Sequence, residues 1–534
     1  MRVHALAALC LTVLTSSIGV ARSADLAAAL PADTIGYVRA RNVPGLYKSF
    51  DRSGIKQQFL DLARNQPDLV AEVKAWDKVV AQVQALHVSY HYAHEYEHHN
   101  VGLLLAADVG RQVDPKEWLP AGLSATMKKI DAAGRATVYH VPSRFPSRCG
   151  VFFAGARDHL WVASDLLLLE GVLDAAANGR KRSLLDDPRY RTAVADLDVW
   201  DVLAYVSAPR LLASLEAMQK RRDRDEFNTA VELLALRDVD ALAWGLDYKG
   251  QASRARILMN PDSDAYRLLA RPPAPNTAAA HLPPSTYFFA TVNVGDGAAT
   301  WKQLDRYLSR RLLRTGALDS LDEYRDGLNE PKEDINIGVP EFAAAVEGDI
   351  GIFFSTDDPL DETGLLFSLK NRKDAEALME KMGRSREFKN AERTTKKLGG
   401  VDVTILSKGT HQHVAWALLG DVLVLSPEPA VVEDCARAFG TGETLAGEKS
   451  TWNLGLILPK KSNALACWNP GRMLSAFEKL DRAPPDVRDW LEEVLVGATA
   501  TVADGQIEIR LAQTKKGLLD GLWRALTAPF FLMR

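Results

Sequence analysis

Cysteine is scarce in this chain, with four among 534 residues. Cys10 lies in an N-terminal segment that we interpret below as a signal peptide, which leaves Cys149, Cys435 and Cys467 in the expected mature chain. An odd count leaves at least one thiol unpaired, and a protein of this length does not need disulfides. The sequence is therefore not that of a disulfide-built scaffold. Cys435 and Cys467 either pair with each other or are buried as small apolar side chains.

Motifs of several enzyme and cofactor-binding classes are missing. The chain has no Gly-x-Ser-x-Gly elbow, Cys-x-x-Cys pair, Gly-x-Gly-x-x-Gly fingerprint or calcium-binding loop. Residues 442–450 approach a phosphate-binding loop, but one extra residue separates glycine from lysine and the segment follows an expected helix. We therefore expect no nucleotide or other organic cofactor, although a catalytic triad assembled from distant residues would leave no motif.

An excess of positive charge is also absent. The formal net charge is −4, and it becomes −6 without Arg2 and Arg22 of the expected signal peptide. The hydrophobic share of 47% and the charged share of 25% are ordinary for a soluble globular protein. This balance gives no support for nucleic acid as a partner.

The N-terminal apolar run, Ala5–Val20, is shorter than the ~20 residues that a membrane-spanning helix needs. Arg2 precedes the run, and Ala21-Arg22-Ser23 follows it with small residues at the −3 and −1 positions. The pattern predicts a signal peptide at 1–23 and export to the periplasm or the cell exterior. A short membrane anchor is the alternative.

The chain resembles itself at a shift of 262 positions, and near its N-terminal end at a shift of 252. The matched pairs are Leu203-Ala204 with Leu465-Ala466, Arg210 with Arg472, Glu216 with Glu478, Gly102-Leu103-Leu104 with Gly364-Leu365-Leu366, and Leu30-Pro31 with Leu282-Pro283. A period this long indicates a duplicated domain, because solenoid repeats run only about 20–50 residues. We predict repeat domains at 24–270 and 278–516, a proline-rich linker at 271–277 and an apolar tail at 517–534.

Each repeat is predicted to be α+β, with a mostly antiparallel sheet and a pseudo-twofold relation between the copies. Strands arrive as adjacent hairpins, with helices between groups of them, which is not the pattern of a doubly wound parallel sheet. The predicted hairpins pair 86–92 with 101–107, 151–156 with 159–164, 349–355 with 363–369, and 413–418 with 421–426. Helices are expected at 44–65 and 300–314.

The opening Leu30-Pro31-Ala32-Asp33-Thr34, followed by an expected strand and a helix from Pro44, resembles the start of a recurrent family of exported bacterial proteins of unknown function. Ser183–Pro188, running toward the strand Val202–Val206, resembles a second stretch of that family. The second copy departs from the pattern, with Pro284-Ser285 in place of Ala32-Asp33. The resemblance covers most of both copies and implies a fold, but no catalytic residues.

The sharpest chemical signal is a histidine cluster, in which five of the eleven histidines fall between positions 87 and 99. His94, Glu95 and His98 satisfy the zincin pattern, in which two histidines one helical turn apart bind zinc and the glutamate activates water. The segment equally satisfies the inverted His-x-x-Glu-His pattern. The candidate metal ligands are His91, His94, Glu95, His98 and His99.

A zincin needs these residues on a helix, and the repeat argues for a hairpin turn instead. His94–His98 aligns with the acidic, proline-containing segment Thr356–Leu360 of the second copy. His87, Ser89 and His91 alternate with apolar or aromatic residues, which is strand periodicity. A long helix from Leu69 through His98 is the competing interpretation. Zinc-dependent hydrolysis therefore stays an alternative, as does structural or adventitious binding of zinc, copper or nickel.

The C-terminal segment is apolar at helical spacing, and it has no counterpart in the first copy. Leu518, Leu522 and Trp523 lie on one expected helix face, and Phe530 and Phe531 follow Pro529. The tail either docks on its own domains or contacts a membrane surface, and it is too short to span a bilayer. The primary hypothesis is an exported two-domain protein that acts by binding an unknown protein or envelope component. It is taken as non-enzymatic, and the zinc-dependent hydrolase is the alternative that leaves enzymatic activity open.

Overall fold

The computed structural model describes residues 26–52, 67–91, 102–130, 136–142, 150–179, 182–218, 224–247, 252–315, 337–355, 363–409, 412–476 and 494–514. The chain forms two compact units. Unit 1 takes the described residues up to Val231 together with Val239–Met259, and unit 2 takes Glu232–Asp238 and the described residues from Asn260 onward. Both units combine helices with antiparallel sheet, which confirms the predicted α+β class.

The sheet of unit 1 has the strand order β4-β5-β6-β7-β3-β2-β1-β8-β9-β10, and every pairing in it is antiparallel. Its strands are β1 (Gly36–Arg41), β2 (Ala85–His91), β3 (Gly102–Asp108), β4 (Lys128–Ile130), β5 (Val138–Pro142), β6 (Gly150–Ala156), β7 (His159–Ala163), β8 (Val202–Ser207), β9 (Val239–Leu246) and β10 (Ala252–Met259). The two predicted hairpins of this half are present as β2–β3 and β6–β7.

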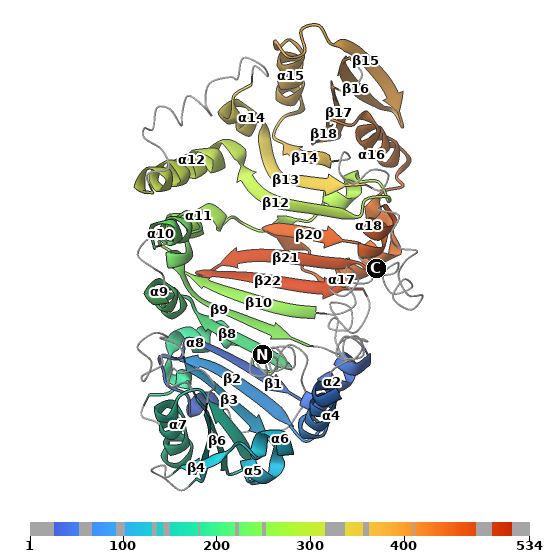
Figure 1. Ribbon diagram of the computed structural model, residues 1–534. Helices are drawn as coiled ribbons and strands as arrows, with labels where there is room; N and C mark the ends of the chain where they lie inside the picture. The colour runs from blue at the N-terminus through green and yellow to red at the C-terminus, as the bar shows by residue number, and fades with distance from the viewer. Residues whose placement is uncertain are drawn as a thin grey trace. The chain divides into compact units, whose positions relative to one another are not determined.

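Helices lie on both faces of this sheet. They are α2 (Val43–Arg52), α4 (Pro67–Val80), α5 (Pro115–Trp118), α6 (Ala121–Ser124), α7 (Leu166–Asn178), α8 (Pro188–Val194), α9 (Ala208–Met218) and α10 (Arg224–Leu233), with 3-10 turns η1 (Leu26–Ala28) and η2 (Leu184–Asp186). Figure 1 shows α7 and α8 on the opposite side of the strands from α2 and α4. One face of the sheet packs under η1, α7 and α8, and much of the other packs under α2, α4 and α5.

Unit 2 has the strand order β15-β16-β17-β18-β14-β13-β12-β20-β21-β22, again with antiparallel pairings throughout. Its strands are β12 (Phe288–Asp296), β13 (Val346–Phe354), β14 (Thr363–Leu369), β15 (Glu392–Leu398), β16 (Val401–Lys408), β17 (Gln412–Leu419), β18 (Val422–Ser426), β20 (Ala464–Trp468), β21 (Val496–Ala503) and β22 (Gln506–Gln513). If the ten strands of each sheet are numbered in chain order, both sheets have the same order, 4-5-6-7-3-2-1-8-9-10.

The helices of unit 2 follow the same plan. They are α11 (Asp264–Leu269), α12 (Gly297–Arg314), α14 (Val339–Ala345), α15 (Arg372–Gly383), α16 (Pro429–Thr441), α17 (Lys449–Ile457) and α18 (Pro470–Ala476), with 3-10 turns η3 (Leu236–Asp238), η4 (Ala278–His281) and η5 (Leu445–Gly447). Helices α16 and α17 pack on one sheet face, and α14 and α15 pack on part of the other.

Of the expected helix 44–65, the described part forms α2, and residues 53–65 lie outside the described residues. The structure differs from the sequence expectations at two other places. The outer strands β4 and β15 were not expected, because neither alternates: β15 is exposed at nearly every position. Within the expected linker 271–277, Ala274 and Pro275 form β11, which pairs with β19 (Lys461–Ser462) of unit 2.

An ion pair ties the start of the central strand of unit 1 to the following helices. Arg210 in α9 lies 2.7 Å from Asp187 Oδ2, and its other terminal nitrogen donates to the Thr34 carbonyl at 3.1 Å. Asp187 is the N-cap of α8, where its other oxygen accepts from the Arg189 amide. A carboxylate at a helix N-terminus and a guanidinium fork are both strong hydrogen-bonding partners, so one side chain fixes three segments.

Unit 2 repeats this arrangement at the corresponding positions. Arg472 in α18 lies 2.7 and 2.6 Å from the two carboxylate oxygens of Glu448, the N-cap of α17. The same guanidinium donates to the Pro284 carbonyl in the segment that opens β12. The matched pair Arg210 and Arg472 thus does the same structural work in both units.

The ion pair of unit 1 predicts a stability loss on mutation. Replacing Arg210 by Ala leaves the Asp187 carboxylate, whose side chain is 6% exposed, without its cation, and we expect about 3 kcal/mol of lost stability in unit 1. Hydrogen exchange in urea, read on peptides of β1 and β8, measures it. Arg310→Ala is the control, because that arginine and its partner Asp264 are both exposed and such pairs contribute at most about 1 kcal/mol. Equal losses in the two variants would contradict the role of the Arg210 ion pair.

Candidate functional site

The candidate site in unit 1 is an apolar face of the sheet, on which several large side chains are exposed. On β1, Tyr37 and Arg39 point to the face under α7 and α8, so Gly36 and Val38 point to the other face. The cross-strand pairs extend that second face over six strands. We call this surface the open face of unit 1; its residues are Leu103, Tyr90, Gly36, Val206, Leu242, Ile257, Val38, Ala204 and Trp244.

Four large side chains of the open face of unit 1 are exposed. Tyr90 is 44% exposed and lies directly opposite Leu103, which is also exposed. Leu242 and Trp244, two residues apart on β9, are exposed on the same face. At a strand spacing of ~4.8 Å and a same-face repeat of ~6.7 Å, this surface covers about 300 Å². Apolar patches of that size on soluble proteins are often functional.

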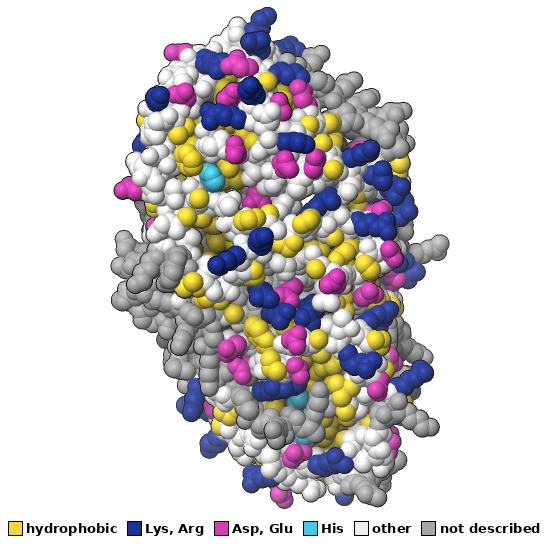
Figure 2. Space-filling view, turned by 180° about the vertical axis from the view of Figure 1, so that it is seen from behind, with side chains coloured by type: hydrophobic (Ala, Val, Ile, Leu, Met, Phe, Trp, Pro, Cys, Tyr) yellow, Lys and Arg dark blue, Asp and Glu magenta, His cyan; other side chains and the backbone are white. Residues whose placement is uncertain are grey.

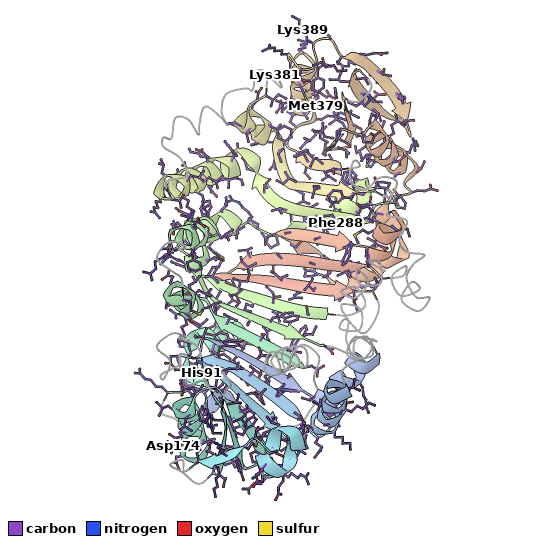
Figure 3. The ribbon with its side chains drawn as sticks, viewed as in Figure 1. His91, Asp174, Phe288, Met379, Lys381 and Lys389 are labelled. Atoms are coloured by element: carbon purple, nitrogen blue, oxygen red, sulfur yellow. The ribbon has the colours of Figure 1, made fainter. Side chains whose placement is uncertain are left out.

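The matching surface of unit 2 is also apolar. We call it the open face of unit 2; its residues are Phe288, Ala290, Val292, Ile350, Ile352, Phe354, Leu365, Ala464, Ala466, Trp468, Val496, Ala498, Ala500, Ile509 and Leu511. Phe288, labelled in Figure 3, lies directly between Phe354 and Trp468 on the neighbouring strands. Its ring centroid is 5.5 Å from that of Phe354, so the two rings fill this place together.

Charge is absent from both open faces and balanced elsewhere on the described surface. Figure 2 shows lysines and arginines interspersed with carboxylates on the face that it displays. Two arginines of α12 are paired within unit 2: Arg310 with Asp264, and Arg311 with Asp238 at 2.9 Å. The open faces therefore suit an apolar partner and offer no ionic contact to a charged one.

Sequence reasoning missed these surfaces because it treated each strand as having one buried face. The sequence does indicate two apolar faces on these strands, since Leu103-Leu104-Leu105 and Phe288-Phe289-Ala290 are apolar at consecutive positions. Strands that read as continuous apolar runs are apolar on both faces, and each such face needs a cover.

Of the predicted metal ligands, only His91 lies within the described residues, at the end of β2 (Figure 3). Its Nε2 is 2.7 Å from Ser89 Oγ, and its Nδ1 is 3.5 Å from Thr34 Oγ1. Because the Thr34 hydroxyl already donates to the Pro31 carbonyl, Nδ1 is the donor to Thr34 and Nε2 accepts from Ser89. His91 is thus a buried structural partner of Ser89.

The remaining members of the cluster, His94, Glu95, His98 and His99, lie outside the described residues, as do the tail residues Leu518, Leu522, Trp523, Phe530 and Phe531. The strands on either side, β2 and β3, pair from His91 and Gly102 onward. The competing long helix from Leu69 through His98 is therefore wrong for 85–91. Across the part of the chain that the structure describes, no group of three potential metal ligands occurs, and no helix is long and apolar enough to cross a membrane.

A second histidine, His87, is buried in the core beneath α7 and α8. Its Nδ1 lies 2.8 Å from the Tyr37 hydroxyl. Burial, followed by the positive charges of His159, Arg39 and Arg41, lowers the pKa of His87 well below its usual range. The neutral imidazole therefore accepts from Tyr37, and its Nε2–H has no partner among the described residues.

His87 makes the stability of unit 1 depend on pH. Because its folded pKa is lowered, the unfolded chain binds the proton first as pH falls below about 6.5, and stability drops by up to about 1.4 kcal/mol per pH unit. Above that pH the contribution is fully present. His87→Gln, which keeps an acceptor for Tyr37, is expected to flatten this dependence in urea unfolding followed by hydrogen exchange of β2 between pH 5 and 7.

His413→Gln in β17 of unit 2 controls for the loss of an imidazole as such. A His87→Gln protein with the same acid sensitivity in β2 as the unmodified protein would show that another group carries it.

Cys435 and Cys467 are free and buried in the core of unit 2, so the pairing alternative is not realised. Burial raises the pKa of both thiols, that of Cys467 to about 12, which keeps them protonated and unreactive. We expect peptides containing Cys435 and Cys467 to escape iodoacetamide in the native protein at pH 8 and to react fully in 6 M guanidinium. Peptide mass spectrometry measures both; rapid native labelling at either residue would contradict the packing.

Comparison with known proteins places the chain in a family but gives it no activity. No curated protein matches the chain. Two solved structures, crystal forms III and I of TP0453, are 12% identical, cover 46% and 45% of this chain and 83% and 81% of that one, and give TM-scores of 0.28 and 0.26. A likeness at this level supports no statement about fold or function.

A family match covers just over half of the 534 residues and runs from the start of β5 to β16. Over residues 137–406 the chain matches the family described as "Protein of unknown function (DUF3352)", and it belongs to that family.

Proposed function

We propose that this protein is a non-enzymatic, exported binding protein of the bacterial envelope, and that it holds the acyl chain of a lipid on its open sheet face. The observation that carries the proposal is the open face of unit 1, an uncharged apolar surface on which Tyr90, Leu103, Leu242 and Trp244 are exposed. The signal peptide expected at 1–23 supports export. The binding would be driven by the removal of apolar surface from water.

The size of the surface favours a lipid over a protein. A stable protein interface buries about 800 Å² on each partner, against about 300 Å² for the open face of unit 1. An acyl chain spans half of a ~30 Å hydrocarbon core, about 15 Å, which fits within six strands spaced at ~4.8 Å. Tyr and Trp side chains such as Tyr90 and Trp244 also suit a ligand with an apolar body and a polar end.

The matching strand orders support a second part of the proposal, that the two units are copies of one ancestral domain. The sequence shifts of 252 and 262 residues bring β1 onto β12 and β8 onto β20. Arg210 and Arg472 take the same role at the same place in each copy. In this view the open face is an inherited feature of the domain, and the two copies have diverged in the side chains that they present on it.

A charged substitution on the open face tests the lipid proposal. Leu242→Glu puts a carboxylate among apolar side chains, and we expect at least a tenfold weaker affinity for oleate, about 1.4 kcal/mol, measured by equilibrium dialysis. Val199→Glu is the matched control, because Val199 is 73% exposed but lies outside the sheet. Absence of saturable oleate binding, or equal binding by both variants, would refute the proposal.

A further inference from the structure

Large and small side chains are sorted into separate rows on the open face of unit 2. One row crosses β13, β12, β20 and β21 in register and consists of large residues: Phe354, Phe288, Trp468 and Val496. Beside it, on β12, β20 and β21, every residue is small over a group of five alanines: Ala290, Ala466, Ala498, Ala464 and Ala500. We call the row of large residues the ridge and the five alanines the trough.

Both the ridge and the trough are accessible at the surface. None of the fifteen residues of the open face of unit 2 is buried, whereas most of the residues that alternate with them along β12, β20 and β21 are. On β20, for example, Leu465 and Cys467 are buried in the core, and the three residues between and beside them are half-buried. None of the fifteen residues is charged. The face therefore presents an uncharged relief of large and small side chains to a partner.

The face is large enough to pair with a copy of itself. At a strand spacing of ~4.8 Å and a same-face repeat of ~6.7 Å, its fifteen residues cover about 480 Å². Two copies packed face to face bury about 1,000 Å² together, which is where specific protein interfaces begin, and interfaces of that size are weak or transient. Removal of this apolar surface from water favours the pairing. The area thus predicts a weak dimer.

The ridge and the trough make the face complementary to itself. A twofold axis that runs across the strands between the two rows turns the face over and places the ridge of one copy above the trough of the other. Phe288 then faces Ala290 of the second copy. Trp468 likewise faces Ala466 of the second copy. Large side chains opposite small ones interdigitate, so the two sheets can approach to the ~10 Å of stacked sheets.

The fold does not require this sorting, because unit 1 lacks it. At the shift of 252 residues, the place of Phe288 in the ridge is taken by Gly36 in unit 1. The place of Ala290 in the trough is taken by Val38. The smaller residue of this pair thus lies where unit 2 has the larger one. The sorting of side chains by size is therefore a property of unit 2 alone.

We propose that the open face of unit 2 is a homodimer interface, in which the ridge of each copy packs into the trough of the other. The partner is a second copy of this chain, because it brings the same two rows in the order that the twofold axis requires. The interface goes beyond the lipid proposal and does not depend on it, since it involves unit 2 and not the open face of unit 1.

Exchanging a large and a small residue tests the pairing. Ala466→Trp sets a ring against Trp468 of the second copy, and Trp468→Ala leaves two small residues facing each other. We expect each variant to dimerise at least tenfold more weakly, measured by sedimentation velocity from about 1 to 200 µM. The double variant Ala466→Trp/Trp468→Ala again sets one large residue against one small one. Its dissociation constant is expected to return to within about threefold of that of the unmodified protein.

Ala204→Trp is the matched control, because Ala204 on β8 is the half-buried counterpart of Ala466 in unit 1. It is expected to leave dimerisation unchanged. Hydrogen exchange of β20 peptides in urea shows whether each variant is folded; if Ala466→Trp is not, Trp468→Ala against the double variant decides.

A full-length protein that is monomeric at about 200 µM overturns the interface. A double variant that dimerises no better than Trp468→Ala does so too. A monomer that dimerises only after removal of residues 517–534 assigns the face to the tail and equally overturns the proposal. Each of these results leaves oleate binding in unit 1 as a separate question, answered by equilibrium dialysis.

Discussion

Apolar side chains on both faces of the central strands are the constraint from which the other features of each unit follow. A strand such as β1 buries Tyr37 on one face and Ala40 on the other, so the sheet must be covered twice. Helices α7 and α8 pack on the first face, and among the described helices α2, α4 and α5 pack on part of the second. Exposed apolar surface is unfavourable in water, so the uncovered part is where a partner gains most by binding.

The two units solve the same packing problem with different chemistry. Where unit 1 places Arg39 and His87 opposite each other under α7 and α8, the register of unit 2 places Thr291 opposite Gly351. A Cβ on Gly351 would come within 2.7 Å of Thr291, so this glycine is required by close packing. Buried polar groups lower stability unless they form hydrogen bonds, and unit 1 places two such groups, Arg39 and His87, in its core. The buried Arg39–His87 pair distinguishes unit 1 from unit 2 at this place in the sheet.

The sequence predicted the parts of the fold that depend on local pattern. Alternating or continuous apolar runs separated by short turns predicted the hairpins β2–β3 and β17–β18, and helical spacing predicted most of α12. It could not predict β15, whose polar residues pair through the backbone alone with β16. The ion pair of Arg210 with Asp187 joins residues 23 positions apart through tertiary structure, and the open face depends on where helices stop. The candidate metal ligands from His94 to His99 stay a prediction.

The most direct test of the account is to photo-cross-link a diazirine-labelled fatty acid to the full-length protein and map the labelled peptides by mass spectrometry. The account predicts saturable labelling on β2, β3 and β9, at exposed residues of the open face of unit 1, with unlabelled oleate competing. Labelling confined to other segments, or labelling that oleate does not displace, would contradict the claim that this sheet face is the binding surface.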